Sequence, residues 1–389
     1  MSTDRSGVCI AVSVRRLGLP ATPKLGGFDS IVNDVIDTNT MTIFIELPLE
    51  SPDEGRLRIG RRGQGLEVTA RSSAHPLSQL SMLFGALRCL MRSPKPRIWA
   101  SADVSLAPIA RLLRGFGIVQ VWYQHFPDFT PPRSRFANSL ASAIYTWCLK
   151  LAWQKADIVT APSERIGAAL VLECDSQRED TLIISNQLSP DDCLRMAEDA
   201  LVPCNCSRTH VLMATSSTDA KFCMDEVIQG VQHFDSVHLL VTGLVTGPYL
   251  DLATVQSSSV SFLGLLSDLQ VRGIAQRCAF GLALYRMDPS DHANFGDSLK
   301  IRLYADEGLP VIASARVSPA AEIAAAGGAV LIDDPHEWVN SLDRVLNDRE
   351  MSARMSAAAK SWAQTEKSLR ARHLRDLKCR INRAVSGQD

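Results

Sequence analysis

Short runs of apolar residues alternate along the whole chain with longer stretches in which apolar residues recur at helical spacing. In the first half, strands are expected over 8–14, 41–47, 97–100, 118–123, 158–161 and 181–185. Helices are expected over 29–36, 77–91, 106–116 and 136–155. Because strands buried on both faces of a parallel sheet read as continuous apolar runs, the alternation predicts an α/β fold.

The second half repeats this pattern. Strands are expected over 209–214, 238–242, 260–263, 280–285, 310–313 and 328–332, and helices over 338–347 and 350–385. A polar, cysteine-containing stretch over 191–208 is interpreted as a linker. The sequence therefore predicts two Rossmann-like, doubly wound domains, over 1–190 and 209–365, that face each other across a cleft. A C-terminal helix over 366–389 could pack back on the first domain.

Composition narrows the class of protein. A chain of 389 residues is long enough for two hydrophobic cores. Its net charge of −1 argues against a general nucleic-acid binder, and 46% apolar residues are typical of a soluble protein. It has no apolar run of about 18 residues that would span a membrane and no signal-peptide pattern at its start, so we expect a cytoplasmic protein. Ten scattered cysteines predict reduced thiols and no metal site.

Residues 297–313 carry the most informative pattern of the chain. Asp297 or Ser298 can cap a helix that Gly308 ends, and a strand that begins with proline follows. The amides at the start of this helix and the Lys300 ammonium make a positive end that suits a phosphate. The alternative for Lys300 is an ordinary solvated lysine.

This segment resembles the donor site of GT-B glycosyltransferases of the group 1 and xanthan glucuronosyltransferase type, which holds the diphosphate of a nucleotide sugar. Stretches 214–219, 239–243, 260–264 and 280–285 resemble the same family in the same order. The resemblance implies that Tyr285 packs on the base. Ser298, the Leu299 amide and Lys300 would hold the diphosphate. It further implies donor contacts for Asp297, Tyr304, Thr215, Gly243 and Gly264.

The chain departs from the resemblance at Leu303, where many retaining members carry a glutamate that binds the ribose hydroxyls. Asp306 or Glu307, one turn later, could compensate or could face solvent. Two alternatives to a transferase therefore stay open. One is a non-catalytic, degenerate transferase that acts as a scaffold or regulator, and the other is a sugar-nucleotide epimerase of the same fold.

The first half resembles an acceptor domain more loosely. Gly26 and Gly27 could let the backbone approach a phosphate or sugar, or could form a simple flexible turn. His125 and Asp128 follow the strand over 118–123, and either could take the acceptor proton as a general base. His125 could equally be an ordinary structural histidine.

Basic and aromatic residues are interleaved between positions 88 and 155. This pattern suits either contact with an anionic membrane surface, where a lipid-linked acceptor would be found, or a core helix with snorkelling ends.

The sequence therefore predicts a glycosyltransferase of polysaccharide biosynthesis, of hexosyltransferase or glucuronosyltransferase type. We expect it to move a sugar from a nucleotide-diphosphate donor, with a UDP-sugar favoured, to a lipid-linked saccharide or another glycan. We expect neither a metal nor another cofactor, and a location in the cytoplasm or at the inner face of the membrane.

Overall fold

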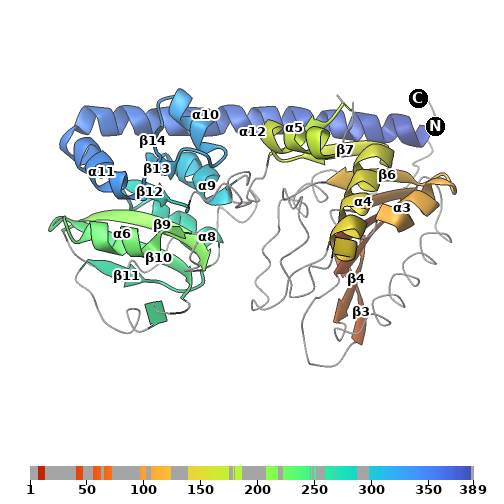
Figure 1. The fold of residues 1–389 in the computed structure, drawn as a ribbon, viewed down its shortest axis with the longest axis horizontal. Helices are drawn as coiled ribbons and strands as arrows, with labels where there is room; N and C mark the ends of the chain where they lie inside the picture. Colours follow the sequence, from red (N-terminus) through yellow and green to blue (C-terminus); the bar gives the residue numbers. More distant parts are fainter. Residues whose placement is uncertain are drawn as a thin grey trace. The chain divides into compact units, whose positions relative to one another are not determined.

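The computed structural model describes residues 8–13, 41–46, 56–62, 65–71, 97–101, 107–123, 139–174, 178, 180–185, 207–217, 222–245, 247, 249–250, 259–266, 268–286 and 298–386. The chain divides into two compact units (Figure 1). Unit 1 comprises residues 1–185 with 370–389, and unit 2 comprises residues 186–369. The helices expected over 29–36 and 77–91, and the linker expected over 191–208 apart from its last two residues, lie outside the described residues.

Unit 1 is built on an eight-stranded sheet in the order β3-β4-β2-β1-β5-β6-β7-β8. Its strands are β1 (Val8–Ser13), β2 (Met41–Glu46), β3 (Arg56–Arg62), β4 (Gly65–Arg71), β5 (Arg97–Ser101), β6 (Val119–Tyr123), β7 (Ile158–Ala161) and β8 (Leu182–Ile183). Its helices include α3 (Ala107–Arg114), α4 (Ser139–Lys155) and α5 (Glu164–Glu173). All strand pairs are parallel except β3 with β4, which form an antiparallel hairpin at one edge that the sequence pattern did not predict.

The helices of unit 1 are held by local capping and by charged contacts. The Ser163 side chain caps α5 by accepting a hydrogen bond from the Ile166 amide at 3.3 Å. Asp157 accepts from the Gln120 amide at 2.8 Å and pairs with Arg114 at 3.2 Å. Asp157 is therefore structural, because it fixes the start of β6 against the end of α3.

Unit 2 contains a six-stranded parallel sheet in the order β11-β10-β9-β12-β13-β14. Its strands are β9 (Thr209–Ser217), β10 (Val237–Leu244), β11 (Val260–Phe262), β12 (Phe280–Ala283), β13 (Val311–Ser314) and β14 (Ala329–Ile332). Its helices include α6 (Met224–Val231), α8 (Asp268–Ala275), α9 (Leu299–Glu307), α10 (Ala320–Ala325), η4 (Pro335–Glu337) and α11 (Trp338–Asn347). Helices α6 and α11 pack together, as do α8 and α9, so the sheet is covered on both faces.

The last helix, α12 (Arg349–Ser386), contributes to both units. In unit 2, Gly328 lets it approach closely, because a Cβ atom at that glycine would lie 2.7 Å from the Ala359 backbone. In unit 1, Leu377 and Ile381 of α12 are buried in the core with Tyr123 of β6.

Within the described residues, no helix combines the length and the apolar character needed to cross a membrane.

Candidate functional site

The sheet of unit 2 has a topological switch point between β9 and β12. From β9 the chain adds β10 and β11 on one side, then crosses back to place β12, β13 and β14 on the other. Strand β12 pairs with β9 only at Phe280–Val211 and Gly281–Leu212. In doubly wound sheets, ligands bind in the crevice beyond the carboxyl ends of the strands at such a point.

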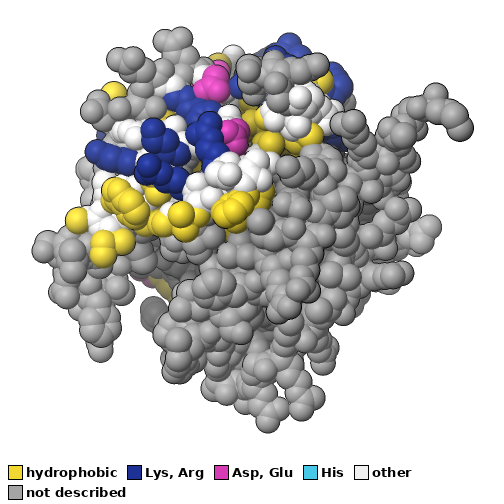
Figure 2. All heavy atoms as spheres, turned by 90° about the vertical axis from the view of Figure 1, so that its right-hand side faces the viewer, with side chains coloured by type: hydrophobic (Ala, Val, Ile, Leu, Met, Phe, Trp, Pro, Cys, Tyr) yellow, Lys and Arg dark blue, Asp and Glu magenta, His cyan; other side chains and the backbone are white. Residues whose placement is uncertain are grey.

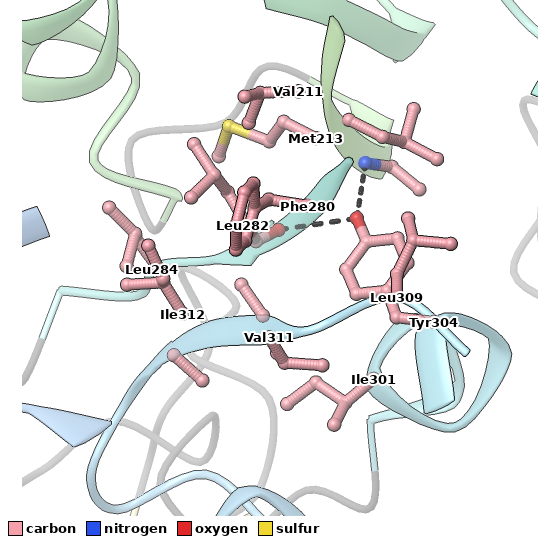
Figure 3. Close-up of a cluster of buried hydrophobic side chains, with 14 of the residues drawn as sticks. Val211, Met213, Phe280, Leu282, Leu284, Ile301, Tyr304, Leu309, Val311 and Ile312 are labelled. Atoms are coloured by element: carbon pink, nitrogen blue, oxygen red, sulfur yellow. Dashed lines mark hydrogen bonds between the residues drawn. The ribbon is translucent and has the colours of Figure 1, made fainter. Parts of the chain in front are cut away.

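Tyr304 of α9 occupies the place where β9 and β12 stop pairing (Figure 3). Its hydroxyl accepts a hydrogen bond from the Ala214 amide of β9 at 2.6 Å. The same hydroxyl donates to the Leu282 carbonyl of β12 at 3.2 Å. Its ring lies against Gly281, where a Cβ atom would be only 2.4 Å away.

These contacts give Tyr304 a structural role, while the donor contact expected from the sequence stays a prediction. The side chain is fully buried, and burial raises the pKa of its hydroxyl far above the ordinary value. The two hydrogen bonds of this hydroxyl join α9 to both strands at the switch point.

Beyond Tyr304, a cluster of polar and aromatic side chains lies at the carboxyl edge of the sheet. The Tyr285 hydroxyl, at the end of β12, is 3.1 Å from the Ser298 hydroxyl at the start of α9. The Lys300 ammonium lies 4.7 Å from the centre of the Tyr285 ring and 3.9 Å from that of Phe222. The two rings are themselves in contact, with centres 5.3 Å apart. Three predicted donor residues, Tyr285, Ser298 and Lys300, are therefore brought together.

The electrostatic character of this cluster is positive. The Lys300 ammonium nitrogen is buried against the two ring faces, an arrangement that stabilises a cation by about 2 kcal/mol when water is excluded. Burial raises the pKa of Tyr285 to about 12, although its hydrogen bond with Ser298 opposes the shift, so Tyr285 stays neutral. The start of α9 adds the positive end of a helix dipole.

Ser298 is the N-cap residue of α9, as expected, but its side chain does not cap the helix. Its hydroxyl faces that of Tyr285, and its amide donates to the Ser318 carbonyl at 2.8 Å. Tyr285 is fixed in turn by Ser314, whose hydroxyl accepts from the Tyr285 amide at 2.9 Å and donates to its carbonyl at 3.2 Å. The backbone around the cluster is therefore held by the Ser314 side chain of β13 and by the backbone carbonyl of Ser318, which precedes α10.

Phe222 was not identified from the sequence. It precedes Cys223, which has a left-handed backbone with φ of 47°, an uncommon conformation for a residue with a side chain. Burial raises the pKa of the Cys223 thiol to about 12, so this cysteine is an unreactive thiol. No local sequence pattern marks Phe222, because its contacts are with residues more than 60 positions away.

Gly243 and Gly264 lie at the carboxyl ends of the neighbouring strands β10 and β11. The Gly243 amide donates to the Gly264 carbonyl at 2.7 Å, and both have positive φ angles, of 117° and 69°. Thr215 lies near the end of β9. These three predicted residues share the carboxyl edge with Tyr285, with Gly243 and Gly264 on the opposite side of β9 from it.

A second charged group lies at this edge and was also missed. The Arg286 guanidinium, just after Tyr285, is 3.4 Å from Glu226 and 3.9 Å from Asp225 at the start of α6. The Tyr249 hydroxyl donates to Asp225 at 2.8 Å, and burial followed by this hydrogen bond raises the pKa of Tyr249 to about 12. The two carboxylates therefore offset the charge of Arg286.

The structure shows whether Asp306 or Glu307 could compensate for the glutamate that Leu303 replaces. The Leu303 side chain is 4% exposed and belongs to the hydrophobic core. Asp306 pairs with Arg272 at 2.9 Å and with Lys367, and Glu307 pairs with Arg272 and accepts from Gln276 at 3.0 Å. Both acids are thus committed to contacts with α8 and α12, at the end of α9 away from Lys300, so neither replaces the missing glutamate.

Five predicted site residues lie outside the described residues. They are Gly26, Gly27, His125, Asp128 and Asp297. Their roles stay predictions from the sequence.

Comparison with protein-family models gives no match, and comparison with curated protein sequences gives none either. Solved structures, in contrast, match nearly the whole chain. Sucrose-phosphate synthase from Thermosynechococcus elongatus matches with a TM-score of 0.72 at 13% identity, over 97% of this chain and 100% of that one. WaaG, a glycosyltransferase involved in lipopolysaccharide biosynthesis, matches with a TM-score of 0.64 at 13% identity, over 94% and 98%. Anabaena HepE in complex with UDP-glucose matches with a TM-score of 0.63 at 14% identity, over 95% and 99%.

The chain has the GT-B fold. This confirms the fold class predicted from the sequence. At 13–14% identity the likeness establishes the GT-B fold alone, so donor and acceptor must be argued from the side chains of the site.

Proposed function

We propose that this GT-B chain is a glycosyltransferase that binds a nucleotide-diphosphate sugar at the carboxyl edge of the unit 2 sheet. The observation that carries the proposal is the position of the Lys300 ammonium. It lies beside the start of α9 and against Phe222 and Tyr285, near the switch point between β9 and β12. A cation and a helix start at this place suit a diphosphate.

In the proposed reaction, the bond between the anomeric carbon and the diphosphate oxygen breaks, and the acceptor hydroxyl oxygen bonds to that carbon. The leaving diphosphate gains negative charge, which Lys300 and the amides at the start of α9 would stabilise. The acceptor proton would pass to His125 or Asp128, the general-base candidates from the sequence. This scheme asks for no metal, because a side-chain cation and a helix dipole meet the developing charge.

A UDP-sugar is the favoured donor, and a hexosyl or glucuronosyl group is the favoured transferred group. The support is the resemblance of residues 280–304 to the donor segment of the xanthan glucuronosyltransferase type, together with the structural likeness to HepE bound to UDP-glucose. The proposed acceptor is a lipid-linked saccharide or another growing glycan. The supporting feature is the basic and apolar surface of unit 1 considered in the next subsection.

A second function is a protein that binds the donor without turning it over, as a scaffold or regulator. The specific observation in its favour is Leu303, which is buried where many retaining enzymes present a glutamate to the ribose. Asp306 and Glu307 do not supply that carboxylate.

Thermal stability of the protein against UDP-, GDP-, ADP- and dTDP-sugars tests the donor site. We expect a selective rise in Tm with one nucleotide series. Lys300→Met, which keeps the length of the side chain but removes its charge, should weaken that binding by about 10–100-fold, the range for a lost charge-assisted hydrogen bond. Lys360→Met, at an exposed position of α12, is the matched control and should bind as the wild type does.

Turnover separates the two functions. Release of free nucleotide from the selected donor in the presence of acceptor lipid extract would support the transferase. Donor binding that depends on Lys300, with no release under any condition, would support the non-catalytic alternative. Absence of binding by every nucleotide tested would overturn both.

A further inference from the structure

Among the side chains that the structure describes, helices α3 and α4 of unit 1, with the turn that follows α3, expose four large apolar ones. Leu112 is 71% exposed, Phe116 57%, Ile144 52% and Trp147 53%. Monomeric proteins seldom leave several side chains of this size exposed on two adjacent helices unless the surface has a partner. We call these four residues, together with the basic residues named next, the α3–α4 surface.

Basic residues accompany the apolar ones. They are Arg111, Arg114, Lys150 and Lys155. Neither helix contains an aspartate or glutamate. The two helices pack together, and Arg114 donates to the Lys155 carbonyl at 3.1 Å, so the basic ends of both helices lie side by side. Figure 2 looks at the side of the molecule on which α3 lies, and shows Lys and Arg side chains gathered beside a row of apolar ones.

We propose that the α3–α4 surface docks on an anionic lipid bilayer. Each basic residue near such a bilayer is attracted to its negative surface potential, and exposed Leu, Phe, Ile and Trp side chains can enter the boundary between headgroups and acyl chains. Tryptophan in particular favours this boundary, because its ring is apolar while its N–H can bond to headgroups. The proposal does not depend on the proposed function, since vesicle binding requires neither donor nor acceptor.

The charge of the surface argues against the other occupants. A second copy of the chain in a two-fold interface would place the same four cations opposite each other, which is repulsive. Asp157, two residues after the end of α4, is already paired with Arg114 and the Gln120 amide. A bilayer rich in anionic headgroups supplies both the negative charge and the apolar layer that this surface requires.

The tryptophans of the chain provide the reporter. Of the six, Trp99, Trp122, Trp153 and Trp338 are at most 2% exposed, and Trp362 is half-buried. Trp147, at 53% exposed, is therefore the tryptophan best placed to respond to a new surface contact. On addition of vesicles containing phosphatidylglycerol, we expect a blue shift in emission and quenching by brominated acyl chains. Both signals should vanish in Trp147→Phe, while that variant still sediments with the vesicles.

Charge variants test the electrostatic part. Arg111→Gln with Lys155→Gln should lower the partition coefficient on these vesicles about 25-fold, from about fivefold for each charge removed. Ile144→Ser with Phe116→Ser should also release the protein. Matched controls are Arg354→Gln, at an exposed site of α12, and Leu172→Ser, at an 82% exposed site of α5, which should bind as the wild type does.

Three outcomes would overturn the proposal. They are no binding to phosphatidylglycerol vesicles, equal binding to vesicles of phosphatidylcholine alone, and unchanged binding by the Arg111/Lys155 double variant. A blue shift that depends on protein concentration without vesicles would instead assign the surface to self-association. All the substituted side chains are accessible, so circular dichroism should show folded variants.

Discussion

Removal of a single oxygen atom, in Tyr304→Phe, should destabilise unit 2 strongly. The Tyr304 hydroxyl is bonded to one backbone group on each side of the switch point, the Ala214 amide and the Leu282 carbonyl. Phenylalanine fills the same space against Gly281 but can neither accept nor donate. The variant therefore leaves two buried backbone groups without their partner while keeping the packing of the ring.

The expected cost follows from those two groups. Each buried donor or acceptor left unsatisfied costs about 1–3 kcal/mol, and part is recovered because the hydroxyl itself no longer has to be buried. The free energy of unfolding of unit 2 should therefore fall by about 2–4 kcal/mol. Tyr249→Phe is the matched control. Its hydroxyl bonds to Asp225, whose carboxylate is 69% exposed and can bind water instead, so the loss should stay below about 1 kcal/mol.

Hydrogen exchange followed by mass spectrometry at increasing urea concentrations measures unit 2 separately from unit 1. Peptides from β9 and β12 should lose protection at lower urea in Tyr304→Phe, and the β9 peptide containing Ala214 should also exchange faster without urea. A change below about 0.5 kcal/mol, or an equal change in Tyr249→Phe, would refute the assignment of Tyr304 as the residue that joins the two strands.

Two further predictions concern the same sheet. Gly281→Ala should lower the free energy of unfolding of unit 2 by about 1–3 kcal/mol in the same assay. The new Cβ atom would lie 2.4 Å from the Tyr304 ring, which is held in place at its hydroxyl. An unchanged free energy of unfolding would mean that the ring can shift. Stability of unit 2 should also fall as the pH drops below 6.5, because burial, with a smaller contribution from nearby His238, lowers the pKa of His210 below that ordinary value. The unfolded chain then binds a proton that folded His210 does not, so stability is present above pH 6.5 and is lost below it. A His210→Gln variant with the same pH dependence as the wild type would contradict this assignment.

The sequence predicted the central strands and the last helices of the fold closely. The strand expected over 158–161 is β7, and the helix expected over 338–347 is α11, with the same bounds. These elements can be recognised in the sequence, because a strand buried on both faces must be apolar throughout. A surface helix, in turn, must repeat its apolar positions every three or four residues.

The β3–β4 hairpin was missed for a physical reason. It lies at the edge of the sheet, and β3 reads Arg-Leu-Arg-Ile-Gly-Arg-Arg, so charged residues interrupt its short apolar alternation. Edge strands commonly carry such charges, which discourage pairing with other chains. The same charges remove the continuous apolar run by which a buried strand is recognised.

The candidate site could be predicted from the sequence only in part. The pattern around Gly308 marked α9, and Tyr285, Ser298 and Lys300 do lie together. Phe222 and the Arg286 group could not be found in the same way, because their partners are distant in sequence and meet only when α6, α9 and β12 pack. Tyr304 carried a donor role by resemblance, which stays a prediction, and its hydrogen bonds add a structural role that the sequence did not indicate.

The spacing of Lys300 and Tyr304 connects the core to the site. Residues four apart on a helix lie on the same face, one turn from each other. Tyr304 fixes that face of α9 by bonding to β9 and β12, and Lys300 is thereby held one turn nearer the carboxyl edge, over Phe222 and Tyr285. Lysine has a flexible side chain, so its use as a phosphate-binding group depends on a helix that is held rigidly. The hydroxyl of Tyr304 holds α9 in place, and Tyr304→Phe should therefore weaken donor binding.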